Sequence, residues 1–128
     1  MFHRFSQRSD KLERLDTGDY TPQEHTRWLR EMRFIHSAFG EINALRRSMI
    51  SHLSAVDSDA VSILDVGAGS GHLLRSVHKL LGARTAFLVA AELNSQAAAA
   101  IAQMATNGEI QALRCDGLKL PFEDNSFD

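Results

Sequence analysis

The second half of the sequence places an acidic residue at or near the end of each of three largely apolar runs. These residues are Asp65, Glu92 and Asp116. A carboxylate at a fixed position attracts an ammonium or sulfonium group and repels a phosphate. The two oxygens of one carboxylate also match two vicinal hydroxyl groups of a sugar. The pattern therefore predicts a site for a ligand with a positive charge and a ribose.

A glycine-rich segment, Gly67-Ala68-Gly69-Ser70-Gly71, begins two residues after Asp65. Glycine allows a sharp turn and lets a ligand approach the main chain, and a helix that starts here has unpaired N–H groups. Dinucleotide sites share these features, but they require Gly or Ala three positions after the second glycine, where this sequence has His72. Since Asp65 would also repel a pyrophosphate, the loop better suits a ligand without phosphate.

The segment from residue 63 to residue 71 closely resembles the first motif of class I S-adenosylmethionine-dependent methyltransferases. The resemblance implies a Rossmann-like α/β fold and S-adenosylmethionine as the cofactor. It also implies that the glycine loop wraps the methionine part of the cofactor, with Asp65 near the amino group. The loop residues implied in binding are Gly67, Ala68, Gly69 and Gly71.

Two later segments resemble further motifs of the same family. Glu92 looks like the acidic residue that accepts the ribose hydroxyl protons, with Leu93 against the adenine. Asp116, followed by Gly117, stands where the family accepts the adenine amino group. Taken alone, Glu92 is equally typical of a helix start and Asp116 of a turn before glycine. Their order and spacing after the glycine loop favour the cofactor interpretation.

The last stretch, Leu120-Pro121-Phe122 through Phe127-Asp128, resembles the entry to the fourth strand of small-molecule methyltransferases, notably those acting on quinone precursors. The family's sheet places that fourth strand beside the first. The resemblance covers residues 61–128, so we expect the cofactor-binding domain to be incomplete at its C-terminus. We also expect these 128 residues alone to be an N-terminal fragment that binds the cofactor without turning over substrate.

The elements that position these motifs alternate along the chain. Residues 61–66 and 85–91 read as buried strands, and 110–115 as a strand with polar interruptions that suits an edge. A helical stripe follows the glycine loop and ends at Gly82, and Asn94 or Ser95 can cap a helix that runs through Met104 to Asn107-Gly108. This alternation predicts a parallel sheet whose carboxyl strand ends carry all three motifs.

The N-terminal part reads as helical after a loosely structured lead that turns at Gly18. Thr21 and Glu24 form a capping box around Pro22, and an apolar stripe from Trp28 to Leu53 follows, as one helix or as two broken near Gly40. We expect residues 1–56 to be a helical extension and 57–128 the cofactor domain. The resemblance makes the extension a lid. Packing of its stripe on the chain's own sheet is favoured over a partner surface.

Composition limits the remaining functions. The formal charge is −2 without a basic patch, so nucleic acid is not a predicted partner. No stretch can span a bilayer and the N-terminus has no apolar signal core, so we expect a cytoplasmic protein. The single cysteine, Cys115, excludes an intrachain disulfide. None of the six histidines is accompanied by further candidate ligands in a pattern typical of a metal site.

The implied reaction is direct displacement at the sulfonium methyl by a nucleophile of a small-molecule acceptor. Positioning dominates such a reaction, and the sequence identifies no catalytic residue and no oligomeric state. Two alternatives stay open. One is a nicotinamide-dinucleotide-binding oxidoreductase domain, which His72 and Asp65 disfavour. The other is a non-catalytic interaction module that keeps the cofactor fold.

Overall fold

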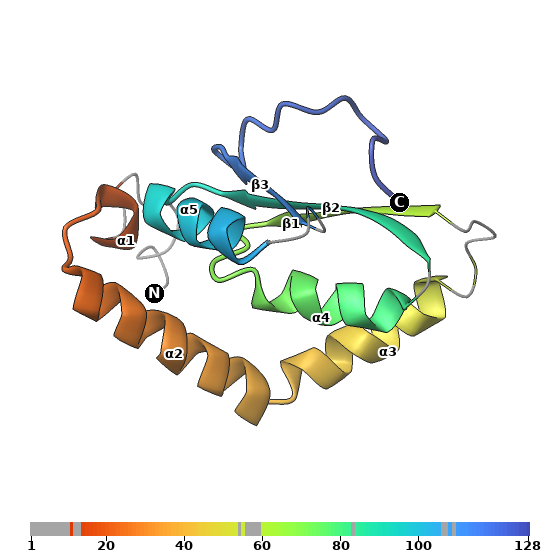
Figure 1. Cartoon of the computed structure of the whole chain (residues 1–128), viewed down its shortest axis with the longest axis horizontal. Helices are drawn as coiled ribbons and strands as arrows, with labels where there is room; N and C mark the ends of the chain where they lie inside the picture. The colour runs from red at the N-terminus through yellow and green to blue at the C-terminus, as the bar shows by residue number, and fades with distance from the viewer. Residues whose placement is uncertain are drawn as a thin grey trace, which may run out of the picture.

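The computed structural model describes residues 11, 14–53, 55, 60–82, 84–105, 108 and 110–128. Figure 1 shows how the elements follow one another through this part of the chain. In order, they are α1 (Arg14–Thr17), α2 (Pro22–Ala38), α3 (Glu41–Leu53), β1 (Ala60–Val66), α4 (His72–Leu81), β2 (Thr85–Glu92), α5 (Ser95–Met104) and β3 (Ile110–Arg114). Each predicted strand and helix of the second half is present, with its ends within about one residue where both are described.

The three strands form one parallel sheet in the order β1-β2-β3. Ile63 pairs with Leu88 between the first two strands, and Leu88 pairs with Ile110 between the second and third. The predicted Rossmann-like α/β class is therefore confirmed for the described residues, and β3 occupies the edge that its polar residues indicated. All three strands end on the same side of the sheet, which brings the three motifs to one edge.

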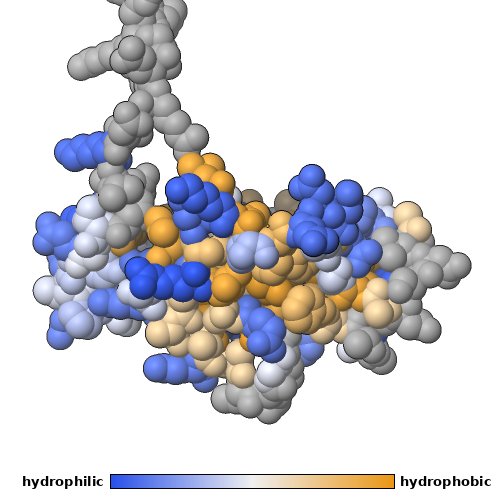
Figure 2. All heavy atoms as spheres, turned by 90° about the horizontal axis from the view of Figure 1, so that it is seen from above, coloured by the Kyte–Doolittle hydropathy of each residue, from blue (hydrophilic) through white to orange (hydrophobic). Residues whose placement is uncertain are grey.

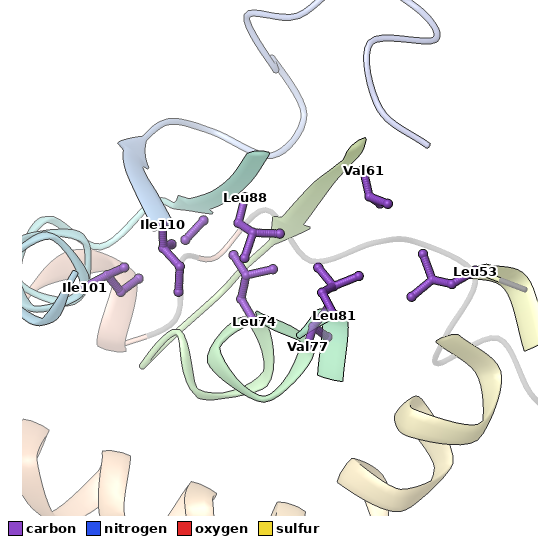
Figure 3. Close-up of a cluster of buried hydrophobic side chains, with 9 residues drawn as sticks. Leu53, Val61, Leu74, Val77, Leu81, Leu88, Ile101 and Ile110 are labelled. Atoms are coloured by element: carbon purple, nitrogen blue, oxygen red, sulfur yellow. The ribbon is translucent and has the colours of Figure 1, made fainter. Parts of the chain in front are cut away.

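Helices α4 and α5 cover one face of the sheet and enclose the core. Figure 3 shows its side chains converging from β1, β2 and β3 onto the two helices. Leu74 of α4, Leu88 of β2 and Ile101 of α5 are almost completely buried. Burial of a side chain of this size contributes about 2 kcal/mol. Helix α4 packs on the core through Leu74, Val77 and Leu81, and its first residue, His72, directly follows the glycine loop.

The opposite face of the sheet is crossed by the last residues of the chain. Phe127 stacks on Phe87 of β2 at a ring-centroid distance of 6.4 Å, and Phe122 meets Phe127 edge-on. The backbone N–H of Asp128 donates to the Ser62 carbonyl at 3.0 Å, and its carboxylate accepts from the Ser62 N–H and hydroxyl. Neither Phe127 nor Asp128 is in a strand, yet they lie beside β1, where the resemblance places the start of a fourth.

Figure 2 looks onto this face, where hydrophobic surface gathers between polar residues. Phe87 of β2, which stacks on Phe127, is 55% exposed, and Val66 of β1 is 50% exposed. This side of the sheet is thus less well covered than the side that faces α4 and α5.

In the N-terminal region, α2 and α3 meet at Gly40, where a φ of 71° marks the end of α2. The capping box is confirmed, because the Thr21 hydroxyl accepts from the Glu24 N–H and the Glu24 carboxylate from the Thr21 N–H. The short helix α1 was not expected. Its four residues carry no apolar period that would reveal it.

The apolar stripe of this region divides at Gly40. Leu53 of α3 joins the core against α4, as expected. The expectation that the whole stripe packs on the sheet is wrong for Ile35 and Phe39, which are 43% and 84% exposed. The turn at Gly40 directs the faces of α2 and α3 differently, and α2 runs below the glycine loop instead of along the sheet (Figure 1).

Some expectations fall outside the described residues. They are the lead over residues 1–10 with His3, the domain boundary between residues 56 and 57, and Asn107 as a helix end. Within the part that the structure describes, no helix is both long enough and apolar enough to cross a membrane.

Candidate functional site

The glycine loop is fastened to the carboxyl end of the neighbouring strand. The backbone N–H groups of Gly67 and Ala68 donate to the Ala91 carbonyl of β2, at 2.9 and 3.2 Å. In the β1–β2 register, Asp65 pairs with Ala90, two positions before Glu92. The parallel pairing therefore brings two carboxylates from different strands to the same loop.

Glu92 joins the two loops that leave β1 and β2. One carboxylate oxygen accepts from the Gly69 N–H at 2.8 Å, and the other accepts from the Asn94 N–H at 2.9 Å. Each carboxylate oxygen can accept more than one hydrogen bond. The carboxylate is thus fixed in place and keeps acceptor capacity for two hydroxyl groups of a ligand.

Asp65 lies half-buried at the end of β1. Burial, and secondarily the negative charge of Glu92, raises the pKa of its carboxyl above the ordinary value. Neither cause of this shift is a neighbouring cation. A ligand cation beside it would stabilise its ionised form.

The glycines of the loop have different tasks. Gly67, Gly69 and Gly71 all have positive φ values, which other residues adopt at a cost. A Cβ at Gly69 would meet only a carbonyl oxygen, at 4.0 Å, so this position opens onto space. A Cβ at Gly71 would lie 3.3 Å from Ile101. Gly71 therefore allows the loop to pack on the core, whereas Gly69 leaves room on the ligand side.

Two cavities lie over this loop. One of about 130 Å³ is enclosed between α2 and the loop, and its lining includes Asp65, Gly67, Ala68, Gly69, Trp28 and Arg33. The other, of about 150 Å³, lies at the end of β2, and its lining includes Gly69, Glu92, Asn94, His25 and Trp28. Both therefore combine the strand-end carboxylates with side chains of the N-terminal region.

A larger cavity of about 390 Å³ lies between α3 and α4. Its lining includes Leu45, Arg46 and Leu80 but no acidic residue, and it is on the far side of α4 from the strand ends. Another cavity, of about 410 Å³, lies along α2 and is larger still, so size alone does not identify the site. The convergence of buried polar groups is the better guide to a ligand site, so we assign the site to the two cavities at the glycine loop.

Asn94 connects this site to the N-terminal region. Its side-chain oxygen caps α5, accepting from the backbone N–H groups of residues 96 and 97. Its side-chain nitrogen donates to the Leu15 carbonyl at 2.7 Å and to the Tyr20 hydroxyl. Tyr20 stacks on the buried His25, and His25 on Trp28. Asn94 thus holds in place the stacked rings of Tyr20, His25 and Trp28, two of which line the site.

Four side chains at the site, those of Trp28, His25, Arg33 and Asn94, were not predicted there. Asn94 was one of two candidate caps of the helix, but nothing in the spacing of residues shows its second role toward Leu15 and Tyr20. The capping box and the apolar residue Trp28 did indicate a helix here. Only the tertiary arrangement shows that this helix faces the loop.

The predicted cofactor residues are brought together in part. Asp65, Gly67, Ala68, Gly69 and Glu92 line the two cavities. The others do not line either one, since Gly71 is buried behind the loop and Leu93, Asp116 and Gly117 are exposed beside it.

The end of β3 is nevertheless close to Glu92. The Cys115 N–H donates to the Glu92 carbonyl at 3.1 Å, which sets Asp116 one residue beyond this contact. The Asp116 carboxylate accepts from the Leu118 N–H in a turn. A Cβ at Gly117 would lie 2.9 Å from a Val66 methyl group, so no side chain fits there without a shift. All three strand ends therefore meet around Glu92.

No group of three or more histidine, cysteine or acidic residues that could hold a metal ion occurs among the described residues. His72 lines the Asp65 cavity as the first residue of α4. Burial, followed by the charge of Arg75, lowers the pKa of its imidazole and so favours the neutral form.

The chain was compared with known families and proteins. Residues 63–128 match the family model described as "Methyltransferase domain". One solved structure, described as a SAM dependent methyltransferase from Aquifex aeolicus, is similar at 22% identity with a TM-score of 0.47. The similarity covers 56% of this chain and 38% of that protein, so the chain spans little more than a third of its length. No curated protein matches the chain.

Proposed function

Since the chain belongs to the methyltransferase-domain family, we propose that it binds S-adenosylmethionine at the glycine loop and takes part in methyl transfer to a small molecule. S-adenosylmethionine is the cofactor that membership of this family implies. The small-molecule acceptor rests on the resemblance of residues 120–128 to methyltransferases of that type. We propose no catalytic residue.

The observation that carries the proposal is the pair of carboxylates on either side of Gly69. Asp65 lines the cavity on one side and suits the ammonium group of the cofactor. Glu92 lines the cavity on the other side and has spare acceptor capacity for the ribose hydroxyls. Arg33 lines the Asp65 cavity and complements the carboxylate of the methionine part. The residues present therefore fit the charges of the cofactor along its length.

We extend the proposed site to the end of β3. Leu93 and Asp116, which flank the Cys115–Glu92 hydrogen bond, would hold the adenine, and Gly117 would give it room. The glycines Gly67, Gly69 and Gly71, with Ala68, would shape the loop around the methionine part.

S-adenosylmethionine supplies a methyl group that its sulfonium has already activated. The chain's own contribution is to hold the ligand in line and to keep water away. Glu92 is fixed by two backbone N–H groups, and α2 covers the loop from the other side. Both features favour positioning as the source of rate enhancement.

The two alternatives predict different ligands and outcomes. A nicotinamide dinucleotide would bring its pyrophosphate against Asp65, which repels it, whereas Glu92 would suit the ribose of either ligand. Calorimetric titration with S-adenosylhomocysteine and with NAD separates these cases, and binding of NAD alone would overturn the proposal. Transfer from labelled S-adenosylmethionine to a panel of phenols, quinols and amines separates an enzyme from a binding module. That these 128 residues bind without turnover stays a prediction, which the same assay tests.

We expect cofactor affinity to depend on the ionisation of Asp65. Because its pKa is raised in the folded protein, affinity for the cationic cofactor should fall as the pH drops toward that raised value, earlier than for an ordinary aspartate. Without ligand the sign is opposite. The folded protein retains a proton that the unfolded chain releases, so stability falls as the pH rises from the ordinary value through the raised one.

Calorimetric titrations and thermal melts between about pH 4 and pH 7 measure the two effects. The variant Asp65→Asn should bind more weakly at neutral pH and lose both dependences. If it kept the pH dependence of the unmodified chain, another group would be responsible.

A further inference from the structure

The two cavities of the site meet at two residues. Gly69 and Trp28 line both cavities. Asp65 and Arg33 line the first cavity alone, and Glu92 and Asn94 line the second alone. A ligand that reaches both carboxylates therefore passes between Gly69 and Trp28.

The chemistry of the proposed cofactor identifies which of its atoms lies at this passage. The sulfonium joins the amino-acid part to the ribose. If Asp65 holds the ammonium group and Glu92 holds the ribose hydroxyls, the sulfonium lies between them. On one side of it is Gly69, which has no side chain. On the other is the indole of Trp28.

Building on the proposed function, we propose that Trp28 faces the sulfonium and makes the site prefer the charged cofactor over its neutral product. The face of an indole attracts a cation within about 6 Å, and tryptophan does so more strongly than other aromatic residues. Arg33 lines the first cavity alone, where the Asp65 carboxylate of opposite charge lines the same wall.

The surroundings hold Trp28 in this place. Its ring stacks on His25, with 6.4 Å between centroids, and His25 stacks on Tyr20 at 5.3 Å. Tyr20 is in turn bound by Asn94, two residues from Glu92. Trp28 is half-buried, which strengthens an attraction to a cation relative to a fully exposed ring. The N-terminal helix thus contributes a specificity-determining residue as well as a cover.

The test compares S-adenosylmethionine with S-adenosylhomocysteine, which lacks the methyl group and the positive charge. Calorimetric titration of Trp28→Leu should show an affinity for S-adenosylmethionine reduced about tenfold, and for S-adenosylhomocysteine about twofold. Trp28→Phe keeps a ring and should lose less of the preference. Phe34→Leu, a matched change at an exposed position of the same helix, should alter neither affinity.

A second measurement uses the unmodified chain and does not depend on the fold of a variant. Because Trp28 is the only tryptophan in the sequence, its fluorescence should change on saturation with S-adenosylmethionine. Unchanged fluorescence would overturn the inference. So would an equal loss of both affinities in Trp28→Leu, which leaves the proposed function intact. Failure of the unmodified chain to bind either compound would instead overturn the proposed function, and the inference with it.

Discussion

Replacement of Glu92 by alanine is expected to weaken S-adenosylmethionine binding about thirtyfold or more. The change removes a carboxylate that would accept from two ribose hydroxyls, and charge-assisted contacts of this kind contribute about 2 kcal/mol or more. It also removes the acceptor for the Gly69 and Asn94 N–H groups, so the loop loses its connection to the end of β2. Both effects act on binding in the same direction.

Calorimetric titration measures this loss, with circular dichroism as the check on folding. Glu92→Gln separates the two effects, because glutamine keeps the size and one acceptor but turns an amide toward a backbone donor. We expect it to bind with intermediate affinity. Glu123→Ala removes the same charge at an exposed position and should bind normally. Normal affinity of Glu92→Ala would remove Glu92 from the site.

Gly69→Val is expected to abolish cofactor binding altogether. The residue has a φ of 55°, a region that β-branched side chains adopt only with strain. The valine side chain would also enter the passage that Gly69 forms with Trp28, where both cavities meet. The variant therefore distorts the loop and fills the path of the ligand.

A matched change at Gly82 isolates the blocking effect. Gly82 has a similar φ of 62° and open space at its Cβ position, but it ends α4 away from the site. Gly82→Val should lower the melting temperature and still bind the cofactor. Should Gly69→Val bind as tightly as the Gly82 variant, the glycine loop would be a structural turn without a ligand.

The second half of the fold follows from local signals in the sequence. Asn94 and Ser95 were both candidate caps, because a short polar side chain can accept from the first helical N–H groups, and the structure shows Asn94 in this role. Gly82 stops α4 through a positive φ that few other residues adopt. The closeness of Asp65 and Glu92 also follows, because parallel strands end at the same edge. These features depend on neighbours in sequence or on sheet topology.

The cover of the site could not be predicted in this way. The spacing of Trp28, Ile35 and Phe39 indicates an amphipathic helix but not its partner, and the turn at Gly40 left Phe39 exposed. The bond from Asn94 to Tyr20 joins residues 74 positions apart. Such contacts depend on how helices dock, which is decided by packing over the whole chain. The spacing of residues along the sequence does not reveal how the helices dock.

The placement of α2 also bears on how fast a ligand arrives and leaves. The two cavities beneath this helix, about 130 and 150 Å³, are each about half the smallest volume common for ligand pockets. Of the residues in α2, only His25 is fully buried, and Trp28, Leu29 and Met32 are half-buried over the first cavity. Because α2 lines both cavities, we expect entry and release to follow the motion of this helix, and the residence time of a bound molecule to depend on it as well as on the strand-end motifs. Two chains with identical motifs would then differ in turnover through their N-terminal helices alone.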